Sequence, residues 1–273
     1  MLILLAPSKT LDMTSPLPFV APATKPLFAR EAKEIKRTIA TLSQNDIEKT
    51  MRLSPALAAK VWQLYHDTSP PEKQALWAYV GDVYRGVHAA TLEKAAADWA
   101  QEHVRISSGL FGLLRPYDLL YPYRLEMQTK ISIGKARTLY DYWGNTLATS
   151  LMENDEKTIV VLSSEEYAKA VTRHLPKTIQ LVTPRFFDHK PNGVVGQVPI
   201  YSKQMRGVMA RWMIDTRCDA PEKLALFTGQ GYYYDAKRST PDSPAFTRLV
   251  MQPLDLPLKS TLSSNVIDVQ VEK

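Results

Sequence analysis

The opening of the chain, Met1–Ala6, is its longest apolar run, and Pro7-Ser8-Lys9-Thr10 follows it directly. A short apolar run that ends in a polar turn is typical of a strand buried on both faces, as in a parallel sheet. It is far shorter than the roughly 20 residues that a helix needs to span a bilayer, and it lacks the basic start and the cleavage site of a signal peptide. We therefore expect no membrane segment and a cytoplasmic protein whose sheet begins with this run.

The composition favours an anionic partner. Among 273 residues, 34 Lys and Arg face 28 Asp and Glu, so the net charge is +6. Such an excess favours binding to polyanions through counterion release. The lone Cys218 excludes an internal disulfide framework and suits a reducing compartment. Its neighbours Arg217 and Asp219 nearly cancel, which predicts an inert thiol.

Helical and strand patterns alternate along the chain, without an internal repeat and without a linker that would separate domains. A proline-rich connector precedes a helix at 28–42, and capping signals at Ser43 and at Ser54-Pro55 predict two more helix starts. We predict strands at 75–80, 104–107, 158–162, 178–183, 198–201 and 231–234, and helices at 91–103, 138–153, 164–172 and 204–216. This order predicts an α/β fold, a single domain in which helices surround one mixed sheet.

Lys9 is the first candidate for a ligand contact, because it follows the opening strand. Open α/β sheets bind ligands at the carboxyl ends of their strands. The segment is not a P-loop, since no glycine lies between Pro7 and Thr14. The alternative is an ordinary surface lysine.

Gly109 and Gly112 bracket two apolar residues in the segment 106–118. Glycine hairpins let backbone amides approach a phosphate closely, as helix-hairpin-helix modules do on DNA, and Arg115 could add a charge-assisted contact. The alternative is a tight core turn whose glycines satisfy positive φ, with a solvated Arg115.

Two further segments pair charged residues. The alternation in 121–127 predicts a strand that places Arg124 and Glu126 on one face, either as a structural salt bridge or as an anion-binding arginine beside a proton-carrying glutamate. Lys203 and Arg206 lie three residues apart at the start of a helix, where free amides and the helix dipole favour anions. A solvated first turn is the rival explanation.

Metal chemistry is not indicated. The five histidines are scattered, and no spacing typical of a first coordination shell joins any two of them. We therefore expect no metal site and no cofactor.

An ordered set of motifs resembles the YaaA-type peroxide-stress protein family over roughly residues 1–248. These motifs are Ala6-Pro7-Ser8-Lys9-Thr10-Leu11-Asp12, Gly81-Asp82-Val83-Tyr84, Ser108-Gly109-Leu110-Phe111-Gly112, Leu114-Arg115-Pro116, Tyr123-Arg124-Leu125-Glu126-Met127, Tyr142-Trp143-Gly144, Ser164-Glu165-Glu166-Tyr167, Lys203-x-x-Arg206-Gly207, Gly231-Tyr232 and Phe246-Thr247-Arg248. Residues 249–273 depart from the pattern, and we expect them to form a C-terminal surface extension.

The resemblance implies a cytosolic protein that protects DNA and protein during peroxide stress and is associated with lower free intracellular iron. It also implies a helix-hairpin-helix element, carried over onto residues 108–116, and a basic cleft that binds DNA. The phosphate-binding residues would be Lys9, Ser108, Gly109, Gly112, Arg115, Arg124, Lys203 and Arg206. Because no metal-binding shell is visible, we interpret the effect on iron as indirect.

Two functions therefore compete. One is a DNA-binding stress protein that contacts duplex or branched DNA without sequence preference. The other is an enzyme that acts on a nucleotide or another small anion, with Lys9, Arg124 and Lys203 holding charge and Glu126 or a tyrosine carrying a proton. The DNA hypothesis requires the five cations of the proposed cleft to gather in one electropositive recess with the hairpin at its rim.

Overall fold

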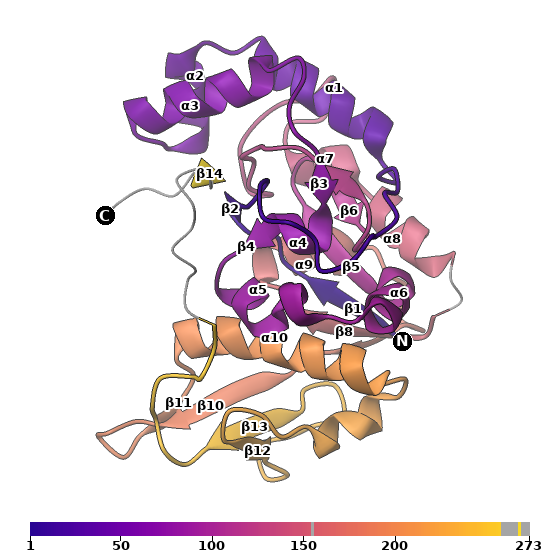
Figure 1. Cartoon of the computed structure of the whole chain (residues 1–273), viewed down its shortest axis with the longest axis vertical. Helices are drawn as coiled ribbons and strands as arrows, with labels where there is room; N and C mark the ends of the chain where they lie inside the picture. The colour runs from indigo at the N-terminus through magenta and orange to yellow at the C-terminus, as the bar shows by residue number, and fades with distance from the viewer. Residues whose placement is uncertain (154–155, 258–266, 269–273) are drawn as a thin grey trace.

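The computed structural model of the chain describes residues 1–153, 156–257 and 267–268. Its central layer is a five-stranded sheet, which confirms the mixed α/β class (Figure 1). In order across the sheet, the strands are β6 (Gly112–Leu114), β5 (Val104–Ser108), β1 (Leu2–Leu5), β8 (Thr158–Leu162) and β9 (Gln180–Val182). All neighbours are parallel except β6, which is antiparallel to β5.

The opening apolar run forms the centre of this sheet, as predicted. All of β1 is buried, and Ile3 is level with Val104 on one side and with Val160 on the other. The predicted strands at 104–107, 158–162 and 178–183 are confirmed as β5, β8 and β9. A continuous apolar sequence suits β1 because helices and loops cover both faces of the sheet.

Three helices form one end of the molecule (Figure 1). They are α1 (Ala29–Ala40), α2 (Gln44–Met51) and α3 (Pro55–His66). The predicted starts are confirmed: Ser43 Oγ accepts a hydrogen bond from the Asp46 amide at 3.1 Å, and Pro55 is the first residue of α3. Each cap satisfies an amide that the helix itself leaves without a partner.

The predicted strand at 75–80 is wrong over most of its length. Residues Ala75–Ala78 form a one-turn helix, α4, between the two-residue strands β3 (Lys73–Gln74) and β4 (Tyr79–Val80). All residues of α4 are buried, so they show no helical periodicity. β3 pairs with β7 (Leu119–Leu120), and β4 pairs with β2 (Thr10–Leu11), whose other neighbour is β14 (Ile267–Asp268).

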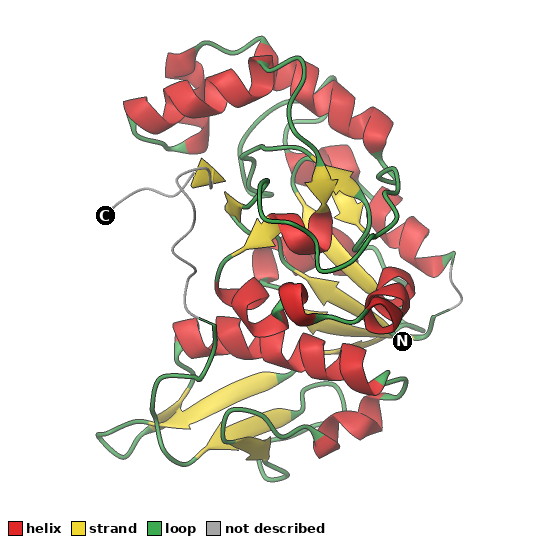
Figure 2. Cartoon of the chain, in the orientation of Figure 1, coloured by secondary structure: helices red, strands yellow, loops and turns green. Residues whose placement is uncertain are grey.

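The remaining helices around the central sheet are α5 (Asp82–Val87), the 3₁₀ turn η1 (Ala89–Thr91), α6 (Lys94–His103), α7 (Leu139–Trp143), α8 (Thr146–Met152) and α9 (Glu165–Thr172) (Figure 2). The predicted helices at 91–103 and 164–172 are confirmed by α6 and α9. The single helix predicted at 138–153 is divided into α7 and α8, because Gly144 adopts a φ of 47°.

A separate four-stranded sheet lies below α10 (Pro199–Thr216), so the described strands do not form the one sheet that we expected (Figure 1). Its strands, in spatial order, are β11 (Val195–Gly196), β10 (Arg185–His189), β13 (Ala245–Arg248) and β12 (Tyr232–Tyr234), and a 3₁₀ segment η2 (Pro221–Leu226) follows α10. The predicted strand at 231–234 is confirmed. The strand predicted at 198–201 is wrong, because Pro199 is the first residue of α10.

The helix α10 joins the two sheets through a backbone contact with α5. A methyl group on Gly207 would lie 1.8 Å from the Val83 carbonyl oxygen, and one on Gly86 would lie 2.4 Å from the Gln204 carbonyl oxygen. Only glycine permits this approach at either position.

Residues 249–257 run along the surface from the four-stranded sheet towards α5. Arg248 donates to the Gln252 carbonyl at 2.7 Å, Gln230 and Asp255 exchange two hydrogen bonds, and Arg85 donates to the Pro257 carbonyl at 2.7 Å. The rest of the predicted C-terminal extension, apart from β14, lies outside the described residues. Among the described residues, no helix has the length and hydrophobicity that crossing a membrane requires.

Candidate active site at the carboxyl edge of the central sheet

The loops after β1, β5 and β8 emerge at one edge of the central sheet, because these strands are parallel neighbours. β1 lies between β5 and β8, so the strands that follow it in the sequence are placed on both of its sides. Such a switch in strand order is the usual ligand site of an open α/β sheet. Lys9 follows β1 at this edge, as the sequence predicts.

Lys9 takes part in an ion-pair network with two residues of the 121–127 segment. Its Nζ lies 2.8 Å from Glu126 Oε1, and Arg124 Nη2 lies 3.4 Å from the same oxygen. The Lys9 side chain is 47% exposed and that of Glu126 22%, whereas that of Arg124 is only 7% exposed. The Lys9 ammonium group is therefore accessible to solvent, whereas the Arg124 guanidinium is largely buried.

The 121–127 segment forms no strand, yet Arg124 and Glu126 do meet. Other contacts hold the segment: Tyr65 donates its hydroxyl hydrogen to the Arg124 carbonyl at 2.9 Å, and the Leu125 carbonyl oxygen would lie 2.5 Å from a methyl group on Gly109. Gly109 thus serves close packing between two loops. The predicted salt bridge is confirmed, although the predicted strand is wrong.

Glu166 adds a second carboxyl group to this network. It lies at the start of α9, directly after β8, and accepts a hydrogen bond from the Gln128 amide at 3.2 Å. Burial raises its pKa above the ordinary value, and the charge of Glu126 raises it further, while the Gln128 amide and Lys9 act in the opposite direction. We call Lys9, Arg124, Glu126 and Glu166 the Lys9 cluster.

A chain of hydroxyl groups lies buried near the cluster. Tyr79 and Tyr123 share a hydrogen bond of 2.6 Å, and Tyr123 and Ser108 share one of 2.7 Å. Burial raises the pKa of Tyr123 to about 12, and it raises that of Tyr79 well above its usual value. Both phenols are therefore protonated at neutral pH, and their hydrogen bonds fix the start of the 121–127 segment.

Residues 108–116, onto which we carried the helix-hairpin-helix element, lie in a β-hairpin made by β5 and β6. Ser108 is fully buried, and its hydroxyl accepts from the amides of Leu110 and Phe111. Gly112 has a φ of 69°, and a methyl group on it would lie 2.9 Å from Trp143. The described residues of this segment thus show no helix-hairpin-helix, and protein groups occupy the amides that a phosphate would need.

Arg115 lies towards the opposite edge of the sheet. Because β6 is antiparallel to β5 and Leu114 is level with Ile106, Arg115 is level with Arg105, near the start of β5. Its guanidinium contacts the fully buried Asp118 at 2.9 Å. Of the five predicted cations, Lys9 and Arg124 meet around Glu126, whereas Arg115 is paired elsewhere.

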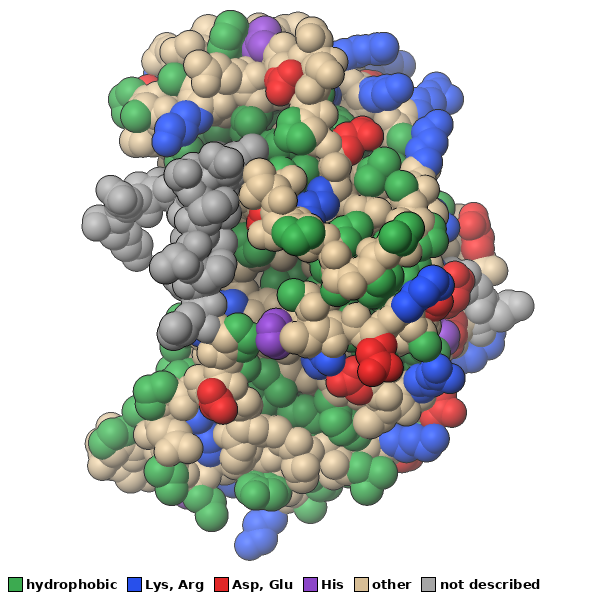
Figure 3. Space-filling model, viewed as in Figure 1, with side chains coloured by type: hydrophobic (Ala, Val, Ile, Leu, Met, Phe, Trp, Pro, Cys, Tyr) green, Lys and Arg blue, Asp and Glu red, His purple; other side chains and the backbone are tan. Residues whose placement is uncertain are grey.

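Lys203 and Arg206 lie in the first turns of α10, which begins on the side of the molecule where the carboxyl ends of β1 and β5 lie (Figure 1). Lys203 is exposed, and burial lowers the pKa of the half-buried Arg206. Within the described part of the chain, neither residue has a carboxylate within ion-pair distance. On the face in Figure 3, cationic side chains gather along α1 and are elsewhere mixed with acidic ones.

Reasoning from sequence left Glu166 out of the predicted site. The signal was present: Ser164-Glu165-Glu166-Tyr167 follows a predicted buried strand at 158–162, as Lys9 follows the first predicted strand.

Among the described residues, no three His, Cys, Asp or Glu side chains gather as a metal site would require.

A family model and several known proteins are similar to this chain over most of its length. The family model described as "Peroxide stress protein YaaA" matches residues 1–238. The UPF0246 protein Bpet1601 of Bordetella petrii is 42% identical over 258 residues, which cover 91% of this chain and 99% of the relative. A UPF0246 protein of Rhizorhabdus wittichii is 42% identical over 253 residues, with the same coverage of both chains. One from Shewanella sp. is 39% identical over 259 residues, again with 91% and 99% coverage. The chain therefore belongs to the YaaA peroxide stress protein family.

Proposed function

We propose that the Lys9 cluster binds a small anionic substrate, such as a nucleotide, and transfers a proton to or from it. The ion-pair geometry supports this proposal most directly, because Lys9 and Arg124 both contact Glu126 Oε1 at the edge of the sheet. Burial and the charge of Glu126 raise the pKa of Glu166, which fits a role as proton carrier. A carboxyl group whose pKa its surroundings raise is a common proton carrier in sites that perform acid–base chemistry near neutral pH.

Each member of the cluster has a role in this proposal. Arg124 holds an anionic group of the substrate, because its largely buried guanidinium presents planar donors. Lys9 reaches the substrate from solvent and adds a second positive charge. Glu126 orients both cations, and Glu166 carries the proton. Lys203 is a further candidate for contact with the anion.

Binding of inorganic phosphate tests the anion site. Replacing Lys9 or Arg124 by Met should weaken phosphate binding by at least about tenfold, since a charge-assisted hydrogen bond contributes about 1.5–3 kcal/mol. The measurement is a calorimetric or NMR titration of the full chain. Lys177→Met, at an exposed lysine on a loop, is the matched control. Equal phosphate affinity in Lys9→Met, Arg124→Met and the unchanged protein would contradict the proposal.

DNA binding is the second candidate, and the observation in its favour is the start of α10. Lys203 and Arg206 lie there with no carboxylate partner among the described residues, and the chain carries a net charge of +6. We propose that these residues contact the phosphates of duplex or branched DNA without sequence preference. The buried hairpin of residues 108–116 does not contribute to this form of the proposal.

A salt-titrated binding assay tests the DNA proposal. The double variant Lys203→Ala/Arg206→Ala should weaken binding to duplex, junction and single-stranded DNA alike, and it should reduce the slope of log affinity against log salt by about one per lost phosphate contact. Unchanged affinity and slope would show that the contact surface lies elsewhere.

Peroxide survival in cells separates the two candidates. If acid–base chemistry protects the cell, Glu166→Gln should abolish protection while Lys203→Ala/Arg206→Ala keeps it, and DNA binding predicts the reverse. We propose that lower free iron is an indirect result of the same activity. Whole-cell measurement of chelatable iron should therefore change together with survival across these variants, and iron levels that do not change with survival would oppose this link.

A further inference from the structure

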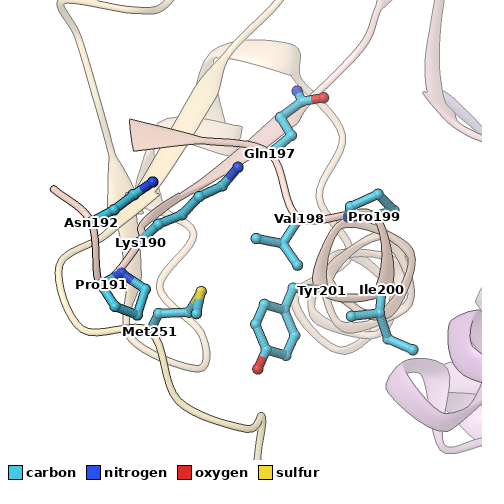
Figure 4. A pocket seen from close by; sticks show the side chains of 9 residues that line it. All are labelled: Lys190, Pro191, Asn192, Gln197, Val198, Pro199, Ile200, Tyr201 and Met251. Atoms are coloured by element: carbon cyan, nitrogen blue, oxygen red, sulfur yellow. The ribbon is translucent and has the colours of Figure 1, made fainter. Parts of the chain in front are cut away.

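A pocket of about 550 Å³ lies beside the start of α10 (Figure 4). The loop that joins β10 to β11 forms one side, the first turn of α10 forms another, and Met251 closes the lower end. This volume is in the range of pockets that hold small molecules. None of its lining residues belongs to the Lys9 cluster.

The pocket has a polar end and an apolar end. Lys190 and Asn192 lie at one end, and Val198, Tyr201 and Met251 lie at the other, while the Gln197 amide points away from Lys190 and Asn192 (Figure 4). The Asn192 side-chain oxygen already accepts from the Val194 amide at 3.2 Å, so its amide nitrogen is left as a donor. The polar end therefore offers the Lys190 ammonium group and the Asn192 amide nitrogen to an anion. The apolar end offers the Tyr201 ring and the Met251 thioether.

A buried ion pair holds the walls of the apolar end. The Arg248 guanidinium lies 4.7 Å from the centre of the Tyr201 ring, and it binds Asp188 Oδ1 through two nitrogens at 2.6 and 2.9 Å. Arg248 also donates to the carbonyl of Gln252, next to Met251, at 2.7 Å. One guanidinium thus fixes both the ring of Tyr201 and the backbone beside Met251.

Burying both charges of this ion pair has a large desolvation cost. The side chains of Asp188 and Arg248 are 1% and 2% exposed, and the second Asp188 oxygen has no hydrogen-bond partner among the described residues. A buried pair with an unsatisfied oxygen gives less stability than apolar packing of the same volume. The pair does, however, hold the Tyr201 ring and the backbone beside Met251 in place.

From this geometry we propose that the pocket binds an aromatic ring that carries one phosphate group, as in a nucleoside monophosphate. The ring stacks on Tyr201 and contacts Met251, since aromatic faces and thioethers both favour such contacts. The phosphate accepts hydrogen bonds from the Lys190 ammonium and from the Asn192 amide nitrogen. A single ammonium at this end matches one phosphate rather than a polyphosphate or a DNA strand.

Titration of the full chain with AMP, adenosine and inorganic phosphate tests this proposal. AMP should bind at least tenfold more tightly than either part alone, because only AMP occupies both ends of the pocket. In protein labelled with ¹³C at the methionine methyl groups, AMP should shift the Met251 signal. Failure of AMP to bind at millimolar concentration would overturn the proposal.

Two variants locate the site. Lys190→Met should weaken AMP binding about tenfold through loss of a charge-assisted hydrogen bond. Met251→Ala should weaken AMP and adenosine alike, and the control Lys177→Met should bind AMP as the unchanged protein does. Loss of AMP binding in Lys9→Met, with full binding in Lys190→Met, would place AMP in the Lys9 cluster and overturn the inference while leaving the proposed function intact.

Discussion

Lys9 Nζ and Glu126 Oε1 lie 2.8 Å apart, which joins the loop after β1 to the segment after β7. The charge of Glu126 raises the pKa of Glu166, and Lys9 lowers it. Glu126→Gln removes the first effect and frees Lys9 to exert the second, so the pKa of Glu166 should fall. A ¹³C NMR titration of the glutamate carboxyl groups measures it, with Glu48→Gln on α2 as the control. A pKa of Glu166 that stays unchanged or rises would contradict the charge arrangement of the cluster.

The raised pKa of Glu166 also predicts how stability depends on pH. A carboxyl group whose pKa is higher in the folded state binds its proton more tightly there. Its contribution to the free energy of unfolding is therefore present at acid pH and is lost as the pH rises through the folded-state pKa. Glu166→Gln keeps an acceptor for the Gln128 amide but does not ionise, so its stability should decrease less than that of the unchanged protein between about pH 4 and pH 8. Urea unfolding across this range measures the difference, and parallel stability curves would refute the prediction.

The hydroxyl chain predicts a stability cost for Tyr123→Phe. The variant leaves the buried hydroxyls of Tyr79 and Ser108 without the bonds of 2.6 and 2.7 Å that they now make. An unsatisfied buried polar group costs about 1–3 kcal/mol, so the free energy of unfolding should decrease by this order. Chemical denaturation measures it, and Tyr233→Phe, at a tyrosine that is 60% exposed, should change little. Equal stability of both variants would show that the chain contributes nothing.

The contact between α5 and α10 predicts that Gly207→Ala is severely destabilising. The added methyl group would lie 1.8 Å from the Val83 carbonyl oxygen, so the helices would have to separate. Overpacking in a core typically costs about 1–3 kcal/mol, and backbone displacement brings the cost to the upper end of that range or beyond it. Gly196→Ala is the control, because its methyl group would meet only the flexible end of Lys190 at 3.3 Å. Thermal unfolding compares the two variants, and similar melting temperatures would mean that the helices adjust easily.

Much of the central sheet could be predicted because its strands are short, apolar and bounded by turn residues. β1, β5 and β8 are almost entirely buried, which leaves an apolar run that sequence reasoning detects. Helix α2 was predictable from Ser43 for a different reason, since capping depends on residues that are close in sequence.

The errors have local physical causes. Residues 75–78 are buried on every side, so α4 lacks an amphipathic pattern. The strand predicted at 198–201 conflicts with the preference of proline for the first turn of a helix, because Pro199 begins α10. The separation of two sheets could not be predicted, because strand pairing between distant segments leaves no trace in either segment alone.

The candidate site was predicted in part. The position of Lys9 at the sheet edge follows from the strand before it, and Arg124 and Glu126 were close enough in sequence to be paired. The contact of Glu126 with Lys9 and the burial of Glu166 depend on the tertiary fold. Arg115 lies towards the other edge of the sheet because β6 is antiparallel to β5. It is therefore separated from the site that we expected at the hairpin.

The close approach of Gly86 and Gly207 has a mechanical consequence. α5 begins after Gly81, where an added methyl group would lie 2.7 Å from Ser8 Oγ, and Ser8 precedes Lys9. A shift at the start of α10 would therefore be passed to α5 by main-chain contact, with no side chain in between to absorb it, and then to the turn that carries Lys9. The start of α10, where the proposed pocket lies, is therefore connected to the turn that carries Lys9 by two close contacts of α5.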